Sequence, residues 1–241
     1  MAALPEHGTT VTSAIGDHGR RATATRLLDH PKGPTVLDRF AVRCFDIAGS
    51  VVLALFSAPL MAGLALLVKL TTRGPVFYGS ERVGTSTETF RAWKFRTMAV
   101  DADDRLRLLL KADPASRDAY ERYGKLLHDP RITPVGKWLR LLSLDELPQL
   151  WNVFIGDMSL VGPRPKLPHE QWLYGSSFAI VSRVKPGLTG LWQVSGRSRL
   201  TYDERIALDV TYVLSRTLRR DIAICFQTAA QMFRPDLSRS R

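Results

Sequence analysis

The chain has 241 residues with a formal net charge of +11, and 45% of its residues are hydrophobic. This length allows one or two small domains, and the hydrophobic content is sufficient for a packed core. The positive charge favours acidic partners, among which nucleic acid, anionic lipid and nucleotide sugars all fit. The two cysteines, Cys44 and Cys225, form no spaced set, which argues against a disulfide framework or a zinc site and favours a reducing, cytoplasmic setting.

Residues 1–35 are predicted to form a disordered or loosely tethered tail. They are rich in Thr, Ala, Gly, Arg and His and show no apolar periodicity. No apolar core follows their charges closely, so we do not expect a signal peptide. Three histidines lie here, namely His7, His18 and His30, and a solvated tail explains them better than a metal site.

An apolar run of 22 uncharged residues follows between Asp46 and Lys69, and its length suffices for one crossing of a bilayer. Basic residues flank the run on both sides, namely Arg39, Arg43, Lys69 and Arg73. Both ends therefore satisfy the positive-inside preference on the same side of the membrane. Pro59 also interrupts the helical hydrogen bonds near the middle of the run. We therefore predict that residues 36–73 form a re-entrant helical hairpin, which enters and leaves on the cytoplasmic face, rather than a single span.

A short β-hairpin is predicted over residues 75–98, which are rich in aromatic and β-branched residues around a Gly-containing break. Its second arm carries Lys94 and Arg96, and strand alternation would place these two on one face. That face could contact a diphosphate or lipid headgroups. For Arg91, on the same arm, a solvated strand face is an equally good explanation.

Two helical segments are predicted next. Residues 100–127 carry leucines at helical spacing and a break at Pro114, which indicates two surface helices. Residues 134–142 form a short basic helix whose tryptophan and leucines suit a membrane interface. Arg140 in this helix is a candidate phosphate ligand, although a solvent-exposed helix charge beside Lys137 explains it about as well.

The stretch from Ser143 to Pro165, SLDELPQLWNVFIGDMSLVGPRP, carries most of the chemical information. A capping box from Ser143 to Glu146 would explain the acidic pair, but Pro148 would then press on a carbonyl four residues earlier, at a cost of roughly 3 kcal/mol. A helix that starts at Asp145 instead places Pro148 in its first turn, where proline is tolerated. The two carboxylates would then point about 100° apart, which suits two different roles. A solvated acidic first turn is the commoner explanation for such a pair taken alone.

The turn over residues 162–165, Gly-Pro-Arg-Pro, restricts the backbone on both sides of Arg164. An arginine held in this way suits bidentate recognition of phosphate. Residues 184–197 are predicted to form a glycine-rich loop that could bring backbone close to a ligand, although they match neither the dinucleotide-binding nor the P-loop pattern. Residues 200–233 predict two helices with a basic cluster of Arg216, Arg219 and Arg220 between them.

Several further motifs occur in a fixed order around this stretch. They are Arg43 and Asp46 before the apolar run, PVFYGSERVG, FRAWKFRTM, DPRITPVGKWLR and VKPGLTGLWQVSGR. Together they resemble the bacterial sugar transferases, monotopic phosphoglycosyl transferases that move a sugar phosphate from a nucleotide sugar to polyprenyl phosphate. The resemblance covers roughly residues 36–235. The chain departs from the family pattern at Ser80, where Gln is usual, and in the residue that separates Ser57 from Pro59.

The resemblance implies a mainly helical α+β fold in a monotopic membrane protein. A re-entrant membrane helix would occupy residues 36–73, and a small cytosolic domain over residues 74–235 would carry the β-hairpin and interfacial amphipathic helices. Residues 236–241 would form a C-terminal tail. The protein is then expected on the cytoplasmic face of the bacterial inner membrane, and its long connector resembles the branch that transfers hexose phosphates.

The resemblance also implies an undecaprenyl-phosphate sugar phosphotransferase that starts exopolysaccharide, capsule or O-antigen assembly. Asp145, ionised at pH 7 because an aspartate has a pKa of about 3.9, would attack the β-phosphorus of a UDP-sugar and release UMP. Undecaprenyl phosphate would then accept the phosphosugar from Asp145. Because a carboxylate must approach a diphosphate, Mg²⁺ is expected on Glu146 and Asp145. The expected substrate-binding residues are Lys94, Arg96, Arg140, Arg164, Gln193 and Arg197.

Two other functions remain open at this point. A non-enzymatic basic protein of the membrane surface, which recruits partners for glycan assembly, would explain the apolar run and the charge but not the acidic pair or the restricted arginine. Nucleic-acid binding fits less well, because no reader motif is present. The expected partners are therefore a UDP-sugar, undecaprenyl phosphate and anionic membrane lipids, without nucleic acid, and a homodimer stays open.

Overall fold

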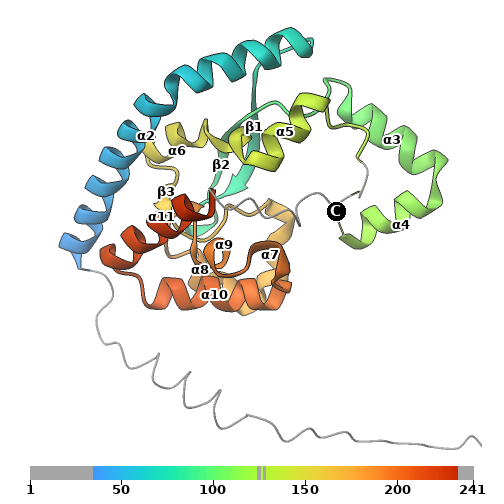
Figure 1. Ribbon diagram of the computed structural model, residues 1–241. Coiled ribbons are helices and arrows are strands. Elements are labelled where there is room, and N and C mark those ends of the chain that lie inside the picture. The colour runs from blue at the N-terminus through green and yellow to red at the C-terminus, as the bar shows by residue number, and fades with distance from the viewer. Residues whose placement is uncertain (1–34, 124–125, 127–128, 233–241) are drawn as a thin grey trace, which may run out of the picture. The chain divides into compact units, whose positions relative to one another are not determined.

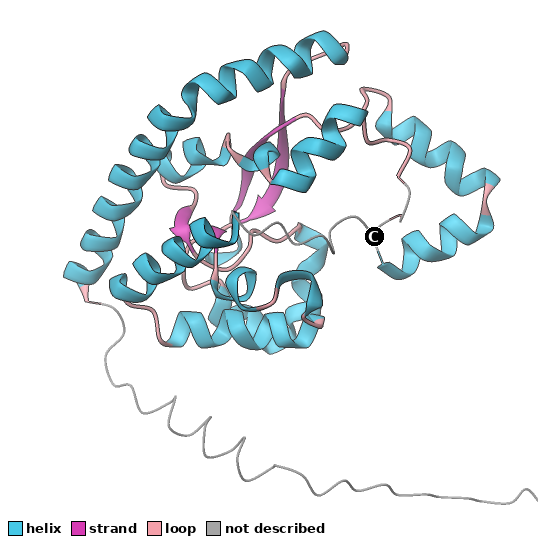
Figure 2. Cartoon of the chain, in the orientation of Figure 1, coloured by secondary structure: helices cyan, strands magenta, loops and turns pink. Residues whose placement is uncertain are grey.

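The computed structural model describes residues 35–123, 126 and 129–232, so the predicted tail up to residue 34 and residues 233–241 lie outside this part of the chain. From Val36 onward the fold is α+β and mainly helical, as predicted (Figure 1; Figure 2). Its strands are β1 (Phe77–Val83), β2 (Thr89–Phe95), β3 (Ser159–Val161) and β4 (Gly187–Thr189). Its helices are α2 (Val36–Thr71), α3 (Ala102–Ala112), α4 (Pro114–Tyr123), α5 (Pro134–Leu142), α6 (Gln149–Ile155), α7 (Gln171–Tyr174), α8 (Phe178–Val181), α9 (Leu191–Ser195), α10 (Tyr202–Leu214) and α11 (Leu218–Met232).

The long helix α2 is continuous over 36 residues, with Pro59 inside it. A proline removes one hydrogen bond and presses on the carbonyl four residues earlier, so it bends a helix without necessarily ending it. Figure 1 shows α2 curving along one side of the fold. Close to the bend, Ser57 Oγ donates a hydrogen bond to the carbonyl of Leu53 at 2.7 Å. The two arms predicted for a hairpin over residues 36–73 are therefore replaced by a single bent helix.

Arg43 and Asp46 attach the N-terminal half of α2 to the rest of the fold. The guanidinium of Arg43 donates to the carbonyls of Val153 and Phe154, at 2.7 and 2.6 Å. It thereby satisfies carbonyls at the C-terminal end of α6, where a cation is also favoured by the helix dipole. The buried carboxylate of Asp46 accepts two hydrogen bonds from neighbouring residues of β3, at 2.9 and 2.8 Å. These contacts explain why a basic residue and an aspartate precede the apolar run.

Two hydrophobic clusters lie against the inner face of α2. The larger cluster is built from α6, β3, α10 and α11, and its buried members are Leu150, Val153, Met158, Leu160, Val161, Tyr212 and Ile224. The smaller cluster joins the other end of α2 to β2 and α5 through Val68, Phe95 and Leu139. Since α2 contributes to both clusters, it belongs to the core of the fold as well as to its surface.

The strands β1 and β2 form the predicted antiparallel hairpin, with Tyr78 opposite Lys94. Asn152 of α6, which is completely buried, fastens this hairpin to the helix. Its Oδ1 accepts from the backbone N–H of Trp93 at 3.0 Å, and its Nδ2 donates to the carbonyl of Arg91 at 2.8 Å and to Asp157 at 3.0 Å. One amide side chain therefore fixes the distance between β2 and the helix that follows the acidic pair.

A second sheet, which the sequence patterns did not indicate, pairs β3 with β4 in parallel. Val161 lies opposite Thr189, and Gly187 packs directly on the turn that follows β3. A Cβ atom at Gly187 would overlap the backbone nitrogen of Gly162, so no side chain fits there. The glycines predicted over residues 184–197 thus allow two segments of backbone to pack closely.

The remaining predicted helices are confirmed. α3 and α4 form the surface pair that is divided at Pro114, and α3 has no buried residue. α5 covers the predicted basic segment, beginning at Pro134 with Thr133 as its N-cap. α10 and α11 are the two C-terminal helices, and Arg216 lies between them.

We predict that Asn152→Ala destabilises the fold by about 2–4 kcal/mol, because it leaves the N–H of Trp93 and the carbonyl of Arg91 without their buried partner. Thermal unfolding in detergent measures the effect. Gln227→Ala removes an amide from an exposed position of α11 and serves as the control. Equal melting temperatures for the two variants would show that Asn152 does not hold the hairpin.

Candidate functional site

The acidic pair lies between two helices. α5 ends at Ser143, whose φ of 58° is left-handed, and Leu144–Glu146 form a single 3₁₀ turn. α6 begins only at Gln149, with Pro148 as the residue before it. The prediction that the helix starts at Asp145 is therefore wrong, since Pro148 is the N-cap of α6 and lies outside its first turn. The turn presents two adjacent carboxylates without the regular geometry of a helix face.

Glu146 is held by two cations from distant parts of the chain. Its Oε1 accepts from Lys94 Nζ of β2 at 2.7 Å and from Arg164 Nη2 of the Gly-Pro-Arg-Pro turn at 3.1 Å. The side chains of Glu146 and Lys94 are 19% and 17% exposed, whereas that of Arg164 is 42% exposed. Burial alone would raise the pKa of Glu146, but the charges of Arg164 and Lys94 outweigh it and lower that pKa to about 2.

Asp145 occupies a different environment, although it is the next residue. It is only 8% exposed, and burial raises its pKa. The charges of Lys94, Arg140 and Arg164 act in the opposite direction without cancelling the effect of burial, and the neighbouring Glu146 adds to the increase. Two adjacent carboxylates whose pKa values shift in opposite directions are a common sign of divided roles in a functional site.

A small hollow opens beside Glu146. Its walls come from β1, β2, the 3₁₀ turn, α6, the Gly-Pro-Arg-Pro turn and β4, and they are formed by Arg82, Ala92, Lys94, Glu146, Gln149, Arg164, Pro165, Gly187 and Leu188. Gln149 is almost completely buried. Arg82 and Gln149 were not predicted as site residues, although Arg82 lies within the motif PVFYGSERVG and Gln149 follows Pro148.

The backbone around Arg164 is held from two sides. Arg82 Nη1 donates to the carbonyl of Pro165, and Lys166 Nζ donates to the carbonyl of Arg164, each at 3.3 Å. Lys166 is itself buried and lies 3.5 Å from the carboxylate of Asp209. These contacts add to the restriction of the backbone by the two prolines. The backbone that carries the Arg164 side chain is therefore fixed.

Arg140 lies on the Asp145 side of the pair. Its Nε donates to Thr97 Oγ1 at 2.8 Å, and its charge interacts with those of Asp145 and Asp129. Asp129 forms a bidentate ion pair with Arg131, with a closest N···O distance of 2.7 Å. Arg140 is exposed, yet its guanidinium has a defined partner, which a freely solvated helix charge would lack.

Four of the predicted substrate-binding residues lie outside the lining of the hollow, namely Arg96, Arg140, Gln193 and Arg197. β2 ends at Phe95, so its alternation does not extend to Arg96, whose guanidinium lies beside Gly74. Gln193 Nε2 donates to the carbonyl of Leu188, one layer behind the hollow, and Arg197 Nε donates to the carbonyl of Gln193. The structure thus brings together five of the predicted site residues, namely Lys94, Arg140, Asp145, Glu146 and Arg164. The other three, Arg96, Gln193 and Arg197, have their contacts elsewhere in the fold.

The acidic pair supplies the carboxylates that are predicted to hold a metal ion. Within the residues that the structure describes, no group of three or more His, Cys, Asp or Glu side chains lies together. Mg²⁺ does not require such a group, because one or two carboxylates combined with the phosphates of a substrate commonly hold it. Asp145 and Glu146 fit this requirement, although Oε1 of Glu146 already accepts hydrogen bonds from Lys94 and Arg164.

The fold and the site define a protein with a long apolar helix on its surface and a cation-rich hollow that is lined by one carboxylate of an adjacent acidic pair. Residues 37–235 match the sequence model of the bacterial sugar transferase family. The chain therefore belongs to the bacterial sugar transferase family, which confirms the predicted resemblance, and the prediction of an enzyme is confirmed at the level of this family.

Named relatives agree with this assignment. The undecaprenyl-phosphate galactose phosphotransferase of Salmonella typhimurium is 47% identical over 199 residues, which cover 82% of this chain and 41% of that protein. The exopolysaccharide production protein ExoY of Rhizobium meliloti is 46% identical over 189 residues, which cover 78% of this chain and 83% of that protein. The undecaprenyl-phosphate glucose phosphotransferase of Komagataeibacter xylinus is 41% identical over 202 residues, which cover 79% of this chain and 35% of that protein. The chain thus spans less than half the length of two of these relatives.

The opposite pKa shifts predict opposite effects on stability at pH 7. Glu146→Gln is expected to destabilise the fold by on the order of 3 kcal/mol, because Lys94 and Arg164 lose their shared partner. The stability that Glu146 contributes is present above pH 4.5 and is lost as the pH falls towards 2. Asp145→Asn is expected to leave stability unchanged or to raise it slightly, because the raised pKa of Asp145 means that the fold favours its neutral form. The stability that neutral Asp145 contributes is lost as the pH rises through its folded-state pKa.

Thermal unfolding of the two single variants at pH 7 tests this prediction, and each variant is the control for the other. A larger loss of stability from Asp145→Asn than from Glu146→Gln would contradict it.

Proposed function

We propose that this protein transfers a hexose-1-phosphate from a UDP-sugar to undecaprenyl phosphate, with release of UMP, through a phosphosugar bound to Asp145. The observation that carries the proposal is the environment of Asp145, a buried carboxylate on which the charges of Lys94, Arg140 and Arg164 act. Relatives that are named as galactose and glucose phosphotransferases acting with undecaprenyl phosphate support the substrate class. Relatives named for exopolysaccharide production support a place at the start of glycan assembly.

The cations offset the repulsion between a carboxylate and a diphosphate. Two unit charges 4 Å apart interact with roughly 4 kcal/mol at an effective dielectric constant of 20. Lys94, Arg140 and Arg164 each lower the pKa of Asp145, so each lies close enough to act on the charge at the reacting oxygen. The same groups can hold phosphate oxygens, and Arg164 offers a planar fork with a restricted backbone.

The reaction then proceeds in two displacements. In the first, an Oδ atom of Asp145 forms a bond to the β-phosphorus, the bond from that phosphorus to the bridging oxygen breaks, and its electron pair leaves on the phosphate of UMP. In the second, an oxygen of undecaprenyl phosphate attacks the same phosphorus, and the carboxylate of Asp145 is restored. No histidine is needed as a general base, because both nucleophiles react as anions.

Asp145 and Glu146 would hold Mg²⁺ together with the phosphates of the donor. The ion would neutralise charge that develops on the phosphate oxygens. Glu146 has a second task in this arrangement, since it fixes Lys94 and Arg164 at the wall of the hollow. Its pKa of about 2 keeps it ionised at every pH at which the protein is expected to work.

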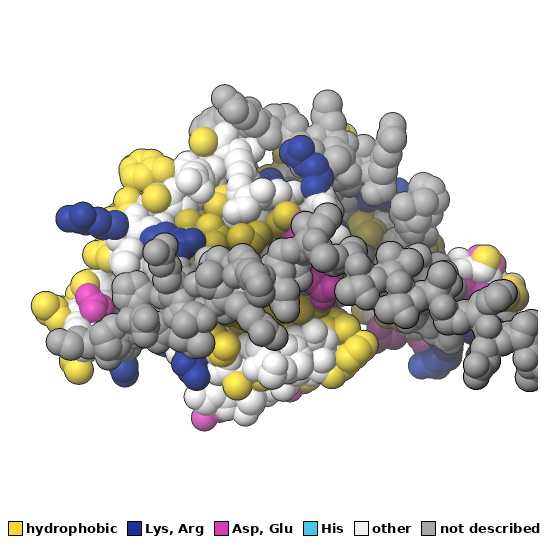
Figure 3. Space-filling model, turned by 90° about the horizontal axis from the view of Figure 1, so that it is seen from below, with side chains coloured by type: hydrophobic (Ala, Val, Ile, Leu, Met, Phe, Trp, Pro, Cys, Tyr) yellow, Lys and Arg dark blue, Asp and Glu magenta, His cyan; other side chains and the backbone are white. Residues whose placement is uncertain are grey.

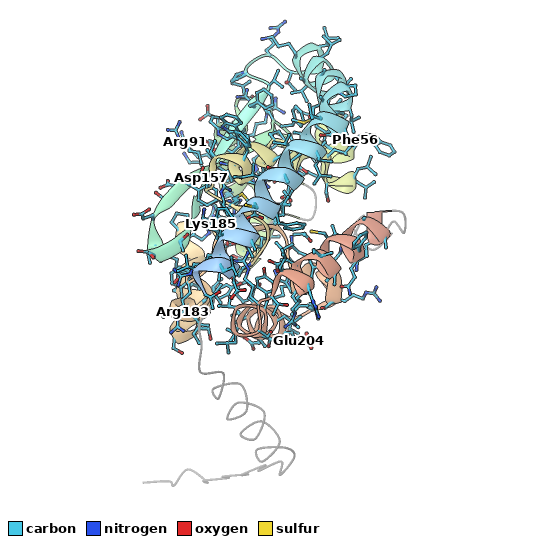
Figure 4. All side chains as sticks on the ribbon, turned by 90° about the vertical axis from the view of Figure 1, so that its left-hand side faces the viewer. Phe56, Arg91, Asp157, Arg183, Lys185 and Glu204 are labelled. Carbon is cyan, nitrogen blue, oxygen red and sulfur yellow. The ribbon has the colours of Figure 1, made fainter. Side chains whose placement is uncertain are left out.

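The protein is proposed to lie on the cytoplasmic face of the bacterial inner membrane, with α2 inserted from one side. By length and composition, α2 is the one described helix that could cross a membrane. Apolar side chains such as Leu55, Phe56 and Leu70 are exposed on it, at 69%, 83% and 76%. Figure 4 shows Phe56 on one side of α2 and the polar residues Arg91 and Asp157 on the other.

Both ends of α2 pack on the same body, which supports a re-entrant path. The N-terminal half contacts α6 and β3, and the C-terminal half packs on Phe95 and Leu139. At about 1.5 Å per residue the helix is about 54 Å long, well above the roughly 30 Å of a hydrocarbon core. A simple crossing would pull one of these packed ends, and the polar surface attached to it, through the bilayer. On the face seen in Figure 3, hydrophobic and basic side chains lie next to each other.

Asp145→Asn is predicted to abolish UMP release, because an amide is a far weaker nucleophile towards phosphorus. The assay incubates the full chain in lipid nanodiscs with UDP-glucose or UDP-galactose and Mg²⁺, and mass spectrometry searches for a phosphosugar on Asp145 when undecaprenyl phosphate is withheld. Asp203→Asn, which removes an exposed carboxylate from the first turn of α10, should retain activity and the adduct. Turnover in Asp145→Asn, or a wild-type protein that makes product without any adduct, would refute the proposed reaction.

Cysteine labelling tests the membrane path. In a background with Cys44→Ser and Cys225→Ser, single cysteines at Leu37 and Thr71, both exposed at the ends of α2, are treated with a membrane-impermeant maleimide. We expect both positions to react in inverted vesicles and neither to react in intact spheroplasts. Labelling of the two ends from opposite sides would establish a crossing helix instead.

A further inference from the structure

Arg82 is a half-buried cation in the hollow, and it forms no salt bridge among the residues that the structure describes. It lies near the end of β1 and lines the hollow with Lys94, Glu146 and Arg164. Its Nη1 donates to the carbonyl of Pro165 at 3.3 Å, which is long for an N–H···O hydrogen bond. Burial and then the charge of Arg164 lower the pKa of Arg82. The charges of Glu170 and Glu146 act in the opposite direction, and a bound anion would add to their effect.

The charges around the hollow leave room for such an anion. Glu146 is shared by Lys94 and Arg164, and Arg82 adds a third cation to the same wall. Among the lining residues, three cations therefore meet one carboxylate, which leaves an excess of positive charge. A diphosphate is an anion that suits such an excess.

The lining of the hollow also distinguishes Arg82 from Asp145. Arg82 lines the hollow with Lys94, Glu146 and Arg164, whereas Asp145 and Arg140 are not among the lining residues. A phosphorus atom attacked by Asp145 must lie next to that carboxylate, so the second phosphate of a bound diphosphate extends towards Arg82.

We propose that Arg82 binds the α-phosphate of the nucleotide, which is the phosphate that leaves with UMP. This inference rests on the proposed function and assigns Arg82 to its first displacement. When the bond between the β-phosphorus and the bridging oxygen breaks, the electron pair moves to that oxygen, and the new negative charge on UMP develops beside Arg82 and Arg164. The phosphosugar stays on Asp145, so Arg82 has no part in the second displacement.

The test compares UMP binding and the two displacements in variants of the full chain in lipid nanodiscs. Arg82→Met keeps most of the side-chain stem and removes the charge, whereas Arg82→Lys keeps the charge and loses the planar fork. Arg91→Met removes an arginine that is exposed on the neighbouring strand β2, so it is the matched control. UMP affinity is measured by titration calorimetry, the first displacement by rapid-quench release of UMP, and the second by transfer from isolated phosphosugar adduct to undecaprenyl phosphate.

For Arg82→Met we expect UMP to bind about tenfold or more weakly and UMP release to slow by at least that factor, because one charge-assisted contact to phosphate is lost. Arg82→Lys should lie between this variant and the wild type, and Arg91→Met should match the wild type. The second displacement should proceed at the wild-type rate in every variant. A merely structural role for Arg82 would slow both displacements together.

Wild-type affinity for UMP in the Arg82 variants, or equal losses in both displacements, would overturn the inference while the proposed function stands. A wild-type protein that releases no UMP would refute the proposed function itself. If Arg82→Met does not give a cooperative thermal transition, Arg82→Lys alone decides, because it preserves a cation that can reach the carbonyl of Pro165.

Discussion

One carboxylate, Glu146, draws together three segments that are far apart in the sequence. Its Oε1 accepts from Lys94 on β2 and from Arg164 after β3, and all three side chains then line one hollow. A buried carboxylate with a single cation would balance its own charge and leave the site neutral. Because two cations share this one, the wall of the hollow keeps a positive charge that an anionic ligand can use.

The neighbouring residue is placed under opposite conditions. Asp145 is buried without a short ion pair among its described contacts, so its pKa rises, whereas Glu146 remains an anion at about pH 2 and above. The 3₁₀ turn makes this difference possible, since it directs adjacent side chains into unlike surroundings within one short segment. Asp145 can thus attack phosphorus while Glu146 holds the cations in place.

The helix α2 links this chemistry to a membrane surface. Its inner face supplies Phe45, Asp46 and Val68 to the packed interior, and its outer face carries the exposed apolar side chains. The same helix therefore stabilises the fold and offers a surface to lipid. Since Arg43 holds the end of α6 and Asn152 of α6 holds β2, the position of α2 is transmitted to the strand that carries Lys94 through two sets of hydrogen bonds.

The sequence by itself determined the features that depend on local patterns: the family, the β-hairpin, the surface helices, the apolar helix and the restricted backbone at Arg164. It misplaced the start of α6, because the competition between a 3₁₀ turn and an α-helix around Pro148 is settled by packing on both sides. It also missed the parallel pairing of β3 with β4, the fastening role of Asn152 and the presence of Arg82 in the hollow. Only the tertiary structure decided these points, because each depends on residues that are distant in the chain, and pairing over such distances leaves no periodic trace in the sequence.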